Sequence, residues 1–397
     1  MPPYQVVSVY FATRTLGLAL LLPGSLALMG LVYARLALQH FGSVQGLWEY
    51  PWPMAALLQI PLRMGAESQT AYLLAWSFAA VLIDAAFAVL LWHAGGRRPT
   101  PGLWLWLGVL PALGPLVLMT SDIVPAVLTA AALLAAAAAR PTVGAGLLAF
   151  AGALKLWPLA GLPALVLPTD ARQRGRLIAA FVAVCAVLGC ATIAEGGMQR
   201  LLSPFAWQQA RGLQVEALAA LPFLWARLLD GAGGWTIVMS RFNCYEVQGP
   251  GVDRALAWSM IAMLLGLLGA ALMYLLAFRS VPGVRTPALA IRLLLLTVLI
   301  LLITNKAFSP QYLVWLAAPL AVLGVLRPWP LERVDSVLFL AGCVLTQVVY
   351  PLNYAALVAQ DGPVLWVLGA LTLRDVLLIV LGARLAVQAW RMSAREQ

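Results

Sequence analysis

The stretch from Thr304 to Leu316 reads TNKAFSPQYLVWL and separates two strongly apolar runs. It holds Lys306, one of only two lysines in the chain, together with an amide, hydroxyl groups and Pro310. A charged group in hydrocarbon is costly and usually faces a partner or a water-filled cavity. The pattern therefore predicts a functional site between two membrane spans. An ordinary loop with interfacial Tyr and Trp anchors is the alternative.

The composition of the whole chain is that of a membrane protein. Of its 397 residues, 63% are hydrophobic and only 10% are charged, whereas a soluble domain carries about a quarter charged residues. Apolar runs of about 20 residues, each long enough to cross a bilayer, recur along the sequence. Because these runs are continuous rather than alternating, they favour helices over a β-barrel. We predict an all-α polytopic membrane protein.

The net charge of +10 follows membrane topology rather than nucleic-acid binding. The arginines gather in short connections and in the C-terminal tail, which is the positive-inside pattern. We therefore expect membrane lipids and no nucleic acid among the partners, and both termini in the cytoplasm. The four cysteines show neither metal spacing nor a disulfide framework. The arginine clusters in these connections and in the tail are Arg97/Arg98, Arg140, Arg172/Arg174/Arg176, Arg279/Arg285/Arg292, Arg327/Arg333 and Arg391/Arg395.

Placing the basic loops inside gives about ten spans plus one re-entrant hairpin, in a single domain covering residues 1–397. The outer loops 39–70 and 195–254 would form much of the active-site face. A helix at the membrane interface is expected at 217–229 within the second of these loops. The predicted spans are about 16–38, 71–92, 103–119, a fourth span that returns to the cytoplasm at Arg140, 177–193, 256–276, 291–303, 313–326, 337–350 and 364–390.

The segment from Val143 to Leu167 lies between two basic, apparently cytoplasmic connections. A hairpin that turns at Lys155-Leu-Trp-Pro158 would enter and leave the membrane on one side. Such a broken helix is tolerated only where it lines a cavity or packs against protein. The alternative, a kinked full span, would invert every later segment and put the later arginines outside. We favour the hairpin.

Polar residues from seven separate segments meet on the predicted outer face, which indicates a pocket. Three cations, Lys306, Arg211 and Lys155, are candidates to bind a phosphate through charge-assisted hydrogen bonds. A nearby carboxylate could deprotonate a hydroxyl acceptor. Asp84, deep in the second span, is expected to have a structural partner on a neighbouring helix instead. The further candidate substrate-binding residues are Tyr50, Gln214, Glu216, Asn305, Ser309, Gln311, Tyr312, Gln347 and Tyr354.

Five motifs, in order along the chain, resemble glycosyltransferase family 87, a family of integral-membrane GT-C enzymes. Trp48-Glu-Tyr-Pro-Trp-Pro53 is similar to the EYPP segment of its first outer loop. Asn305-Lys-Ala-Phe-Ser-Pro-Gln-Tyr-Leu-Val-Trp315 is the closest match, to NKVFSPQYLLWL. The other three are Ser121-Asp122 with Lys155-Leu-Trp-Pro158, Arg211-Gly-Leu-Gln-Val-Glu216, and Thr346-Gln-Val-Val-Tyr-Pro-Leu-Asn-Tyr354.

The resemblance implies a GT-C helix bundle in the plasma membrane that acts on the extracytoplasmic side. It implies inverting transfer of a hexose, with mannose expected, from a polyprenyl-phosphate donor to a lipid or polysaccharide hydroxyl. The family's usual base is a first-loop Asp, but this chain reads Leu-Met-Gly-Leu-Val before Tyr33 and has no acid between Tyr33 and Glu49. Three interpretations stay open: Glu49 is the base, Asp122 is the base, or the chain is catalytically weak or inactive.

Two further functions stay open. A non-catalytic relative could bind polyprenyl phosphate or a protein partner. A transporter of lipid-linked glycans would need a polar path that continues to the cytoplasmic face, and the one-sided gathering of polar residues argues against it. The residues require no cofactor, and a divalent metal is not expected. The donor would be a substrate.

Overall fold

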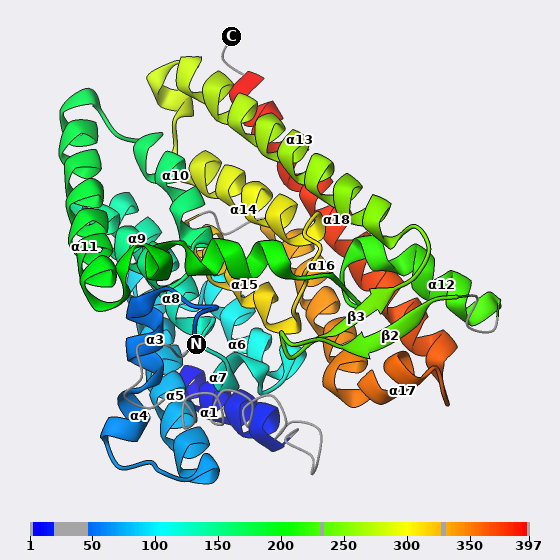
Figure 1. The fold of residues 1–397 in the computed structure, drawn as a ribbon. Coiled ribbons are helices and arrows are strands. Elements are labelled where there is room, and N and C mark those ends of the chain that lie inside the picture. Colours follow the sequence, from blue (N-terminus) through cyan, green and yellow to red (C-terminus); the bar gives the residue numbers. More distant parts are fainter. Residues whose placement is uncertain (1–2, 20–46, 231–233, 327–330, 395–397) are drawn as a thin grey trace.

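The computed structural model describes residues 3–19, 47–230, 234–326 and 331–394. Figure 1 shows a molecule built mainly from helices, with one small sheet. Within these residues, five helical segments are long and apolar enough to cross a membrane. They are α5 (Gln69–Ala94), α11 (Ala171–Ala210), α13 (Val252–Arg279), Arg333–Leu352 and α18 (Val364–Ala394). The prediction of a helical, membrane-embedded protein is confirmed. The ten crossings and the position of the termini stay predictions.

Shorter helices complete the bundle. In the first half they are α1 (Pro3–Ala19), α3 (Trp52–Leu58), α4 (Ile60–Arg63), α6 (Pro101–Leu113), α7 (Leu116–Met119), α8 (Ile123–Ala137), α9 (Pro141–Leu154), η1 (Trp157–Gly161) and α10 (Leu162–Val166). In the second half they are η2 (Leu218–Ala220), α12 (Leu221–Leu229), η3 (Pro282–Val284), α14 (Pro287–Ile303), η4 (Pro310–Leu313), α15 (Val314–Leu326) and α17 (Tyr354–Ala359). The long segment Arg333–Leu352 belongs to α16 (Leu331–Gln347) and η5 (Val348–Leu352). The helix expected at 217–229 is present as η2 and α12.

Several helices begin where their sequence contains a start signal. A Ser, Thr or Asp side chain at the N-cap accepts a hydrogen bond from a backbone N–H of the first turn, which satisfies a group that the helix itself leaves unpaired. Proline follows Thr100 and Thr286 directly, at a position where its missing N–H costs nothing. The caps are Ser68 for α5, Thr100 for α6, Asp170 for α11 and Thr286 for α14.

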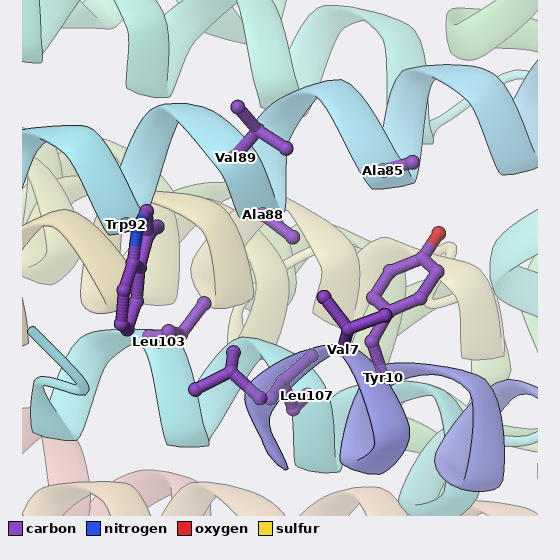
Figure 2. A pocket seen from close by; sticks show the side chains of 9 residues that line it. Val7, Tyr10, Ala85, Ala88, Val89, Trp92, Leu103 and Leu107 are labelled. Atoms are coloured by element: carbon purple, nitrogen blue, oxygen red, sulfur yellow. The ribbon is translucent and has the colours of Figure 1, made fainter. Parts of the chain in front are cut away.

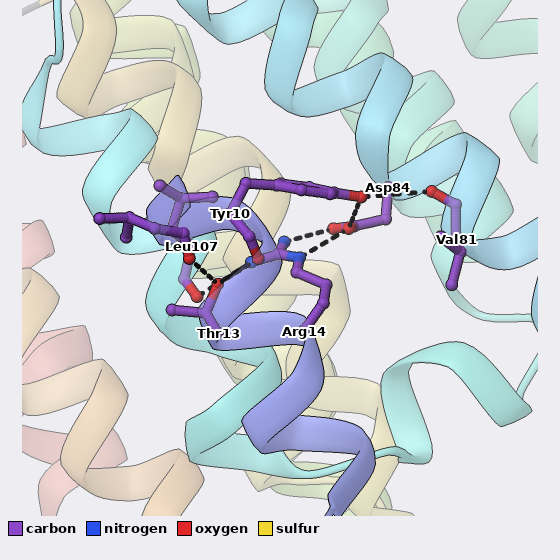
Figure 3. A network of polar contacts seen from close by, with 7 residues as sticks. Tyr10, Thr13, Arg14, Val81, Asp84 and Leu107 are labelled. Carbon is purple, nitrogen blue, oxygen red and sulfur yellow. Dashed lines mark hydrogen bonds and ion pairs between the residues drawn. The ribbon is translucent and has the colours of Figure 1, made fainter. Parts of the chain in front are cut away.

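A buried ion pair joins α1 to α5 (Figure 3). Asp84 is 1% exposed, and Arg14 donates to its Oδ1 from Nη2 at 2.6 Å and to its Oδ2 from Nε at 2.8 Å. The Tyr10 hydroxyl donates to the same carboxylate at 2.7 Å, and Arg14 also reaches the carbonyl of Leu107 on α6. The structural partner expected for Asp84 is therefore Arg14, which ties three helices together.

The segment 143–167 is a helical hairpin, as predicted. α9 ends at Leu154, Lys155 is extended, and η1 and α10 then pack back against α9. The two limbs meet closely, because a Cβ on Gly152 would lie 2.2 Å from Leu159 and one on Gly161 would lie 3.0 Å from Leu148. The break puts Lys155 at the tip of the hairpin. Whether the hairpin enters a membrane from one side stays a prediction.

The helix α11 consists of two helices separated at Gly196 and Gly197, whose backbone is not helical. The first, 171–195, contains the predicted span 177–193. The second, 198–210, crosses the bundle toward the sheet (Figure 1). This sheet, which the sequence had not led us to expect, consists of β1 (Leu213–Gln214), β3 (Tyr245–Gln248) and β2 (Thr236–Met239) in the order β1-β3-β2, all antiparallel.

Other predicted spans differ from the observed helices at their ends. Gly114 and Pro115 divide the predicted span 103–119 into α6 and α7. Most of the predicted first span, 16–38, lies outside the described residues.

A second buried polar network joins α14, α16 and α18. Asp335 of α16 accepts hydrogen bonds from Arg384 and Gln388 of α18, and Gln388 accepts one from Arg292 of α14. These three helices are not part of the hairpin, although α14 packs against it.

Replacing Asp84 by Asn should destabilise the protein by about 3–5 kcal/mol, because it leaves the buried Arg14 without its counter-charge. Thermal unfolding in detergent micelles would measure the change. Glu67→Gln, at an exposed carboxylate in the preceding loop, is the control and should behave as wild type. The apolar double variant Arg14→Met/Asp84→Leu should recover much of the loss. Equal stability of Asp84→Asn and wild type would contradict this role.

A second stability prediction concerns the contact of α6 with α15. A Cβ on Gly102 would lie 1.9 Å from the carbonyl oxygen of Ala321, and one on Gly324 would lie 2.7 Å from the Gly102 nitrogen. Gly102→Ala should therefore force the helices apart and lower the unfolding temperature. Gly146→Ala, in α9 with open space around it, should be neutral or gain up to about 1 kcal/mol from helix propensity. Similar unfolding temperatures for the two variants would refute the close contact.

Candidate functional site

Asp122, one of the two candidate bases, is contacted by residues from two other segments that the sequence singled out. It is 0% exposed, at the junction of α7 and α8. Lys155 donates to its Oδ1 at 2.5 Å and the Trp315 indole N–H donates to the same atom at 2.6 Å. The pair joins the tip of the hairpin, the start of α8 and the start of α15. Lys155, predicted to bind phosphate, is thus engaged by Asp122, and its side chain remains 17% exposed.

Three stacked aromatic rings surround this ion pair. Trp315 stacks on Tyr312 with ring centroids 4.2 Å apart and on Trp157 at 5.3 Å. The Lys155 ammonium lies 4.8 Å from the centroid of Tyr312 and 5.0 Å from that of Trp315. Both distances are within the range of cation–π attraction. The rings therefore stabilise the cation in a mostly apolar setting and fix its direction.

Arg211 and Lys306 form a second group, linked to the first by Tyr312. Arg211 interacts electrostatically with the Tyr312 hydroxyl and donates to the Cys244 sulfur at 3.6 Å. Lys306 donates to the carbonyl of Gln209 at 2.9 Å. Partial burial and the nearby Arg211 lower the pKa of Lys306, although the Glu246 carboxylate acts in the opposite direction. Arg211 and Lys306 therefore lie close enough to affect each other, with the Glu246 carboxylate beside Lys306.

Glu49 lies at the other end of the helix 198–210. It interacts electrostatically with Arg200, a buried residue whose guanidinium also donates to Leu47 and lies 4.9 Å from the centroid of the Trp48 ring. Lys306 is anchored on Gln209 of the same helix. Arg200 and Gln209 are nine positions apart, which is roughly 13 Å along the helix axis. The helix therefore connects the half-buried Glu49 with the two cations.

A third polar group lies around Glu216, which is 1% exposed. Arg374 of α18 donates to the Glu216 carbonyl at 2.6 Å and forms an ion pair with Asp375 at 2.7 Å. Gln214 donates to the Glu216 carboxyl at 3.4 Å. Burial raises the pKa of the Glu216 carboxyl to about 8, with Arg374 opposing the shift and Asp375 adding to it. Arg374 and Asp375 were not among the predicted site residues.

The remaining predicted residues lie around these groups. Asn305 accepts a hydrogen bond from Gln208, and Ser309 precedes η4 and is buried. Gln347, with its amide nitrogen turned toward α6, donates to the carbonyls of Pro111 and Ala112. It thereby supplies donors to carbonyl groups in the last turn of α6. Tyr50 is buried, and Tyr354 interacts electrostatically with both Glu216 and Cys244. Tyr354 thereby connects the Glu216 group with Arg211.

An apolar hollow of about 180 Å³ between α1, α5 and α6 shares no residue with these groups (Figure 2). It lies beside the Arg14–Asp84 pair, because Tyr10 contributes to both. Its lining offers almost no hydrogen-bonding groups, so it does not bear on polar chemistry. Among the described residues, no three His, Cys, Asp or Glu side chains gather into a metal-binding group. The hollow is lined by Val6, Val7, Tyr10, Ala85, Ala88, Val89, Trp92, Leu103 and Leu107.

A comparison with protein-family models and with curated proteins found no match to the chain.

The raised pKa of Glu216 predicts a pH-dependent stability. The folded state binds the Glu216 proton more tightly than the unfolded chain does. The stabilisation of the folded state that results is complete below pH 4.5 and is lost as the pH rises to about 8. Glu216→Gln keeps the shape and removes the titration, so its unfolding temperature should vary less over this range than that of wild type. Unfolding in detergent across the pH range measures this. Parallel curves for the two proteins would show that Glu216 is not protonated when folded.

Proposed function

We propose that the protein is a membrane glycosyltransferase that moves a hexose, with mannose as the first to be tested, from a polyprenyl-phosphate donor to a hydroxyl of a lipid or polysaccharide. The proposed reaction takes place at the outer face of the plasma membrane. The observation that carries the proposal is the pair of cations Arg211 and Lys306, which meet where the helix 198–210 ends, with the half-buried carboxylate of Glu49 near its other end. The likeness of five motifs to glycosyltransferase family 87 supports the same reaction.

The two cations suit the phosphate of the donor. Arg211 and Lys306 carry only donors. Within the described residues, Glu246 is the one carboxylate that acts on Lys306, and a donor phosphate would join it in balancing the two positive charges. The same contacts stabilise the leaving group, because negative charge develops on the phosphate as the bond to the sugar breaks. Lys155 is less suited to this role, since Asp122 already holds its ammonium.

Of the two candidate bases, Glu49 fits the proposed reaction better. Asp122 is already paired with Lys155 and accepts a second hydrogen bond from Trp315. Glu49 is only half-buried and so is more accessible to an acceptor. In the proposed reaction the acceptor oxygen attacks the anomeric carbon, Glu49 takes the acceptor's proton, and polyprenyl phosphate leaves with the electrons of the broken C–O bond. A single displacement of this kind inverts the anomeric configuration.

Membranes that contain the protein should transfer label from a polyprenyl-phosphate hexose to an endogenous acceptor. Glu49→Gln should lower the rate by about 10²- to 10⁴-fold, the usual contribution of a general base. Glu67→Gln, at the other acid of the same loop, should leave it unchanged. Full activity in Glu49→Gln would exclude Glu49 as the base. No transfer by wild type with any polyprenyl-phosphate sugar would refute the proposed function.

A further inference from the structure

The hydrogen bonds of Asp122 are distributed unevenly between its two oxygens. Lys155 and Trp315 both donate to Oδ1, whereas Oδ2 is buried and has no hydrogen-bond partner among the described residues. A buried carboxylate oxygen without a donor is costly, because burial removes its water. Rotating the carboxylate by half a turn would not remove the problem, since it only exchanges the two oxygens. One oxygen of Asp122 therefore lacks a donor within the described part of the protein.

Two neighbouring polar groups are in the same state. The Ser121 hydroxyl and the Gln311 side-chain oxygen are buried and have no partner in the described part of the chain. Gln311 comes four residues before Trp315, in η4, which leads directly into α15. Trp315 bonds to Asp122, and α7, which leads into Ser121, packs against η4, which contains Gln311. The three unpartnered groups thus belong to one cluster.

The chemistry of the cluster selects the kind of ligand. A carboxylate oxygen and an amide oxygen accept hydrogen bonds, and a serine hydroxyl accepts or donates. A ligand that carries several hydroxyl groups satisfies all three. The phosphodiester of a lipid-phosphate sugar does not, because it carries no O–H group and its negative charge is repelled by Asp122. Arg211 and Lys306 have the opposite character, since they only donate.

We propose that Ser121, Asp122 and Gln311 form a hydroxyl-binding cluster that recognises the sugar of the lipid-phosphate donor. This inference rests on the proposed function and divides the site into two parts. Arg211 and Lys306 hold the phosphate, and the cluster holds hydroxyls of the attached hexose. Lys155 and Trp315 are positioning residues, because they occupy Oδ1 and so direct Oδ2 toward the sugar.

Binding of two lipids to the purified full-length protein in nanodiscs tests this division. The probes are polyprenyl phosphate and polyprenyl-phosphate mannose of the same chain length. Wild type should bind the mannose-carrying lipid more tightly. Gln311→Met and Ser121→Ala, which leave the ion pair intact, should each weaken binding of that lipid by about 3- to 10-fold and leave binding of the sugar-free lipid unchanged. Asp122→Asn should weaken it further, and its unfolding temperature shows whether it is folded.

Lys306→Met is the contrasting variant and should weaken binding of both lipids by a similar factor, because it removes a phosphate contact. Gln199→Met, at an exposed glutamine of the helix 198–210, is the matched control and should change neither. The inference is overturned if the cluster variants weaken both lipids equally or neither of them. Wild type that binds neither lipid overturns it together with the proposed function. Discrimination by the cluster without any sugar transfer would support the inference and count against the enzyme.

Discussion

The ion pair between Lys155 and Asp122 is the interaction on which the arrangement of the site depends. Neither charge is stable alone in an apolar bundle, since the cost of removing an ion from water is several kcal/mol even after relaxation. The pair therefore forces the tip of the hairpin and the start of α8 together. Trp315 adds a third segment by donating to the same oxygen. Three stretches of chain that are distant in sequence thus meet at one atom.

The same principle organises the rest of the described bundle. Arg14 and Asp84 join α1 to α5, Arg384 and Asp335 join α18 to α16, and Arg374 next to Asp375 holds the loop that contains Glu216. Helices in lipid gain little from apolar contact alone, because lipid tails are as apolar as leucine. Polar contacts and close backbone packing, such as that between Gly102 and Gly324, therefore determine which helices are neighbours.

Much of the helix pattern could be predicted from the sequence, because long apolar runs and capping residues are local signals. The hairpin could also be predicted, since basic segments on both sides of 143–167 required a return. Pairings across the chain could not. Lys155 and Asp122 are 33 residues apart, and nothing local shows that they bond to each other rather than to a ligand. Arg374 and Asp375 lie inside a long apolar helix and carry no motif. The sheet was missed because its strands have only two to four residues.

The break at Gly196 and Gly197 divides α11 into the apolar helix 171–195 and the helix 198–210, which lies next to the site. Gly197 has φ 70° and open space around it, so the backbone turns there without the strain that a side chain would add. A membrane-spanning helix adjusts its tilt to the thickness of the bilayer. Because the backbone is not helical at the two glycines, we expect a change in the tilt of 171–195 to be absorbed at this joint. We therefore expect the spacing between Glu49 and the cations to be insensitive to the lipid composition around the protein.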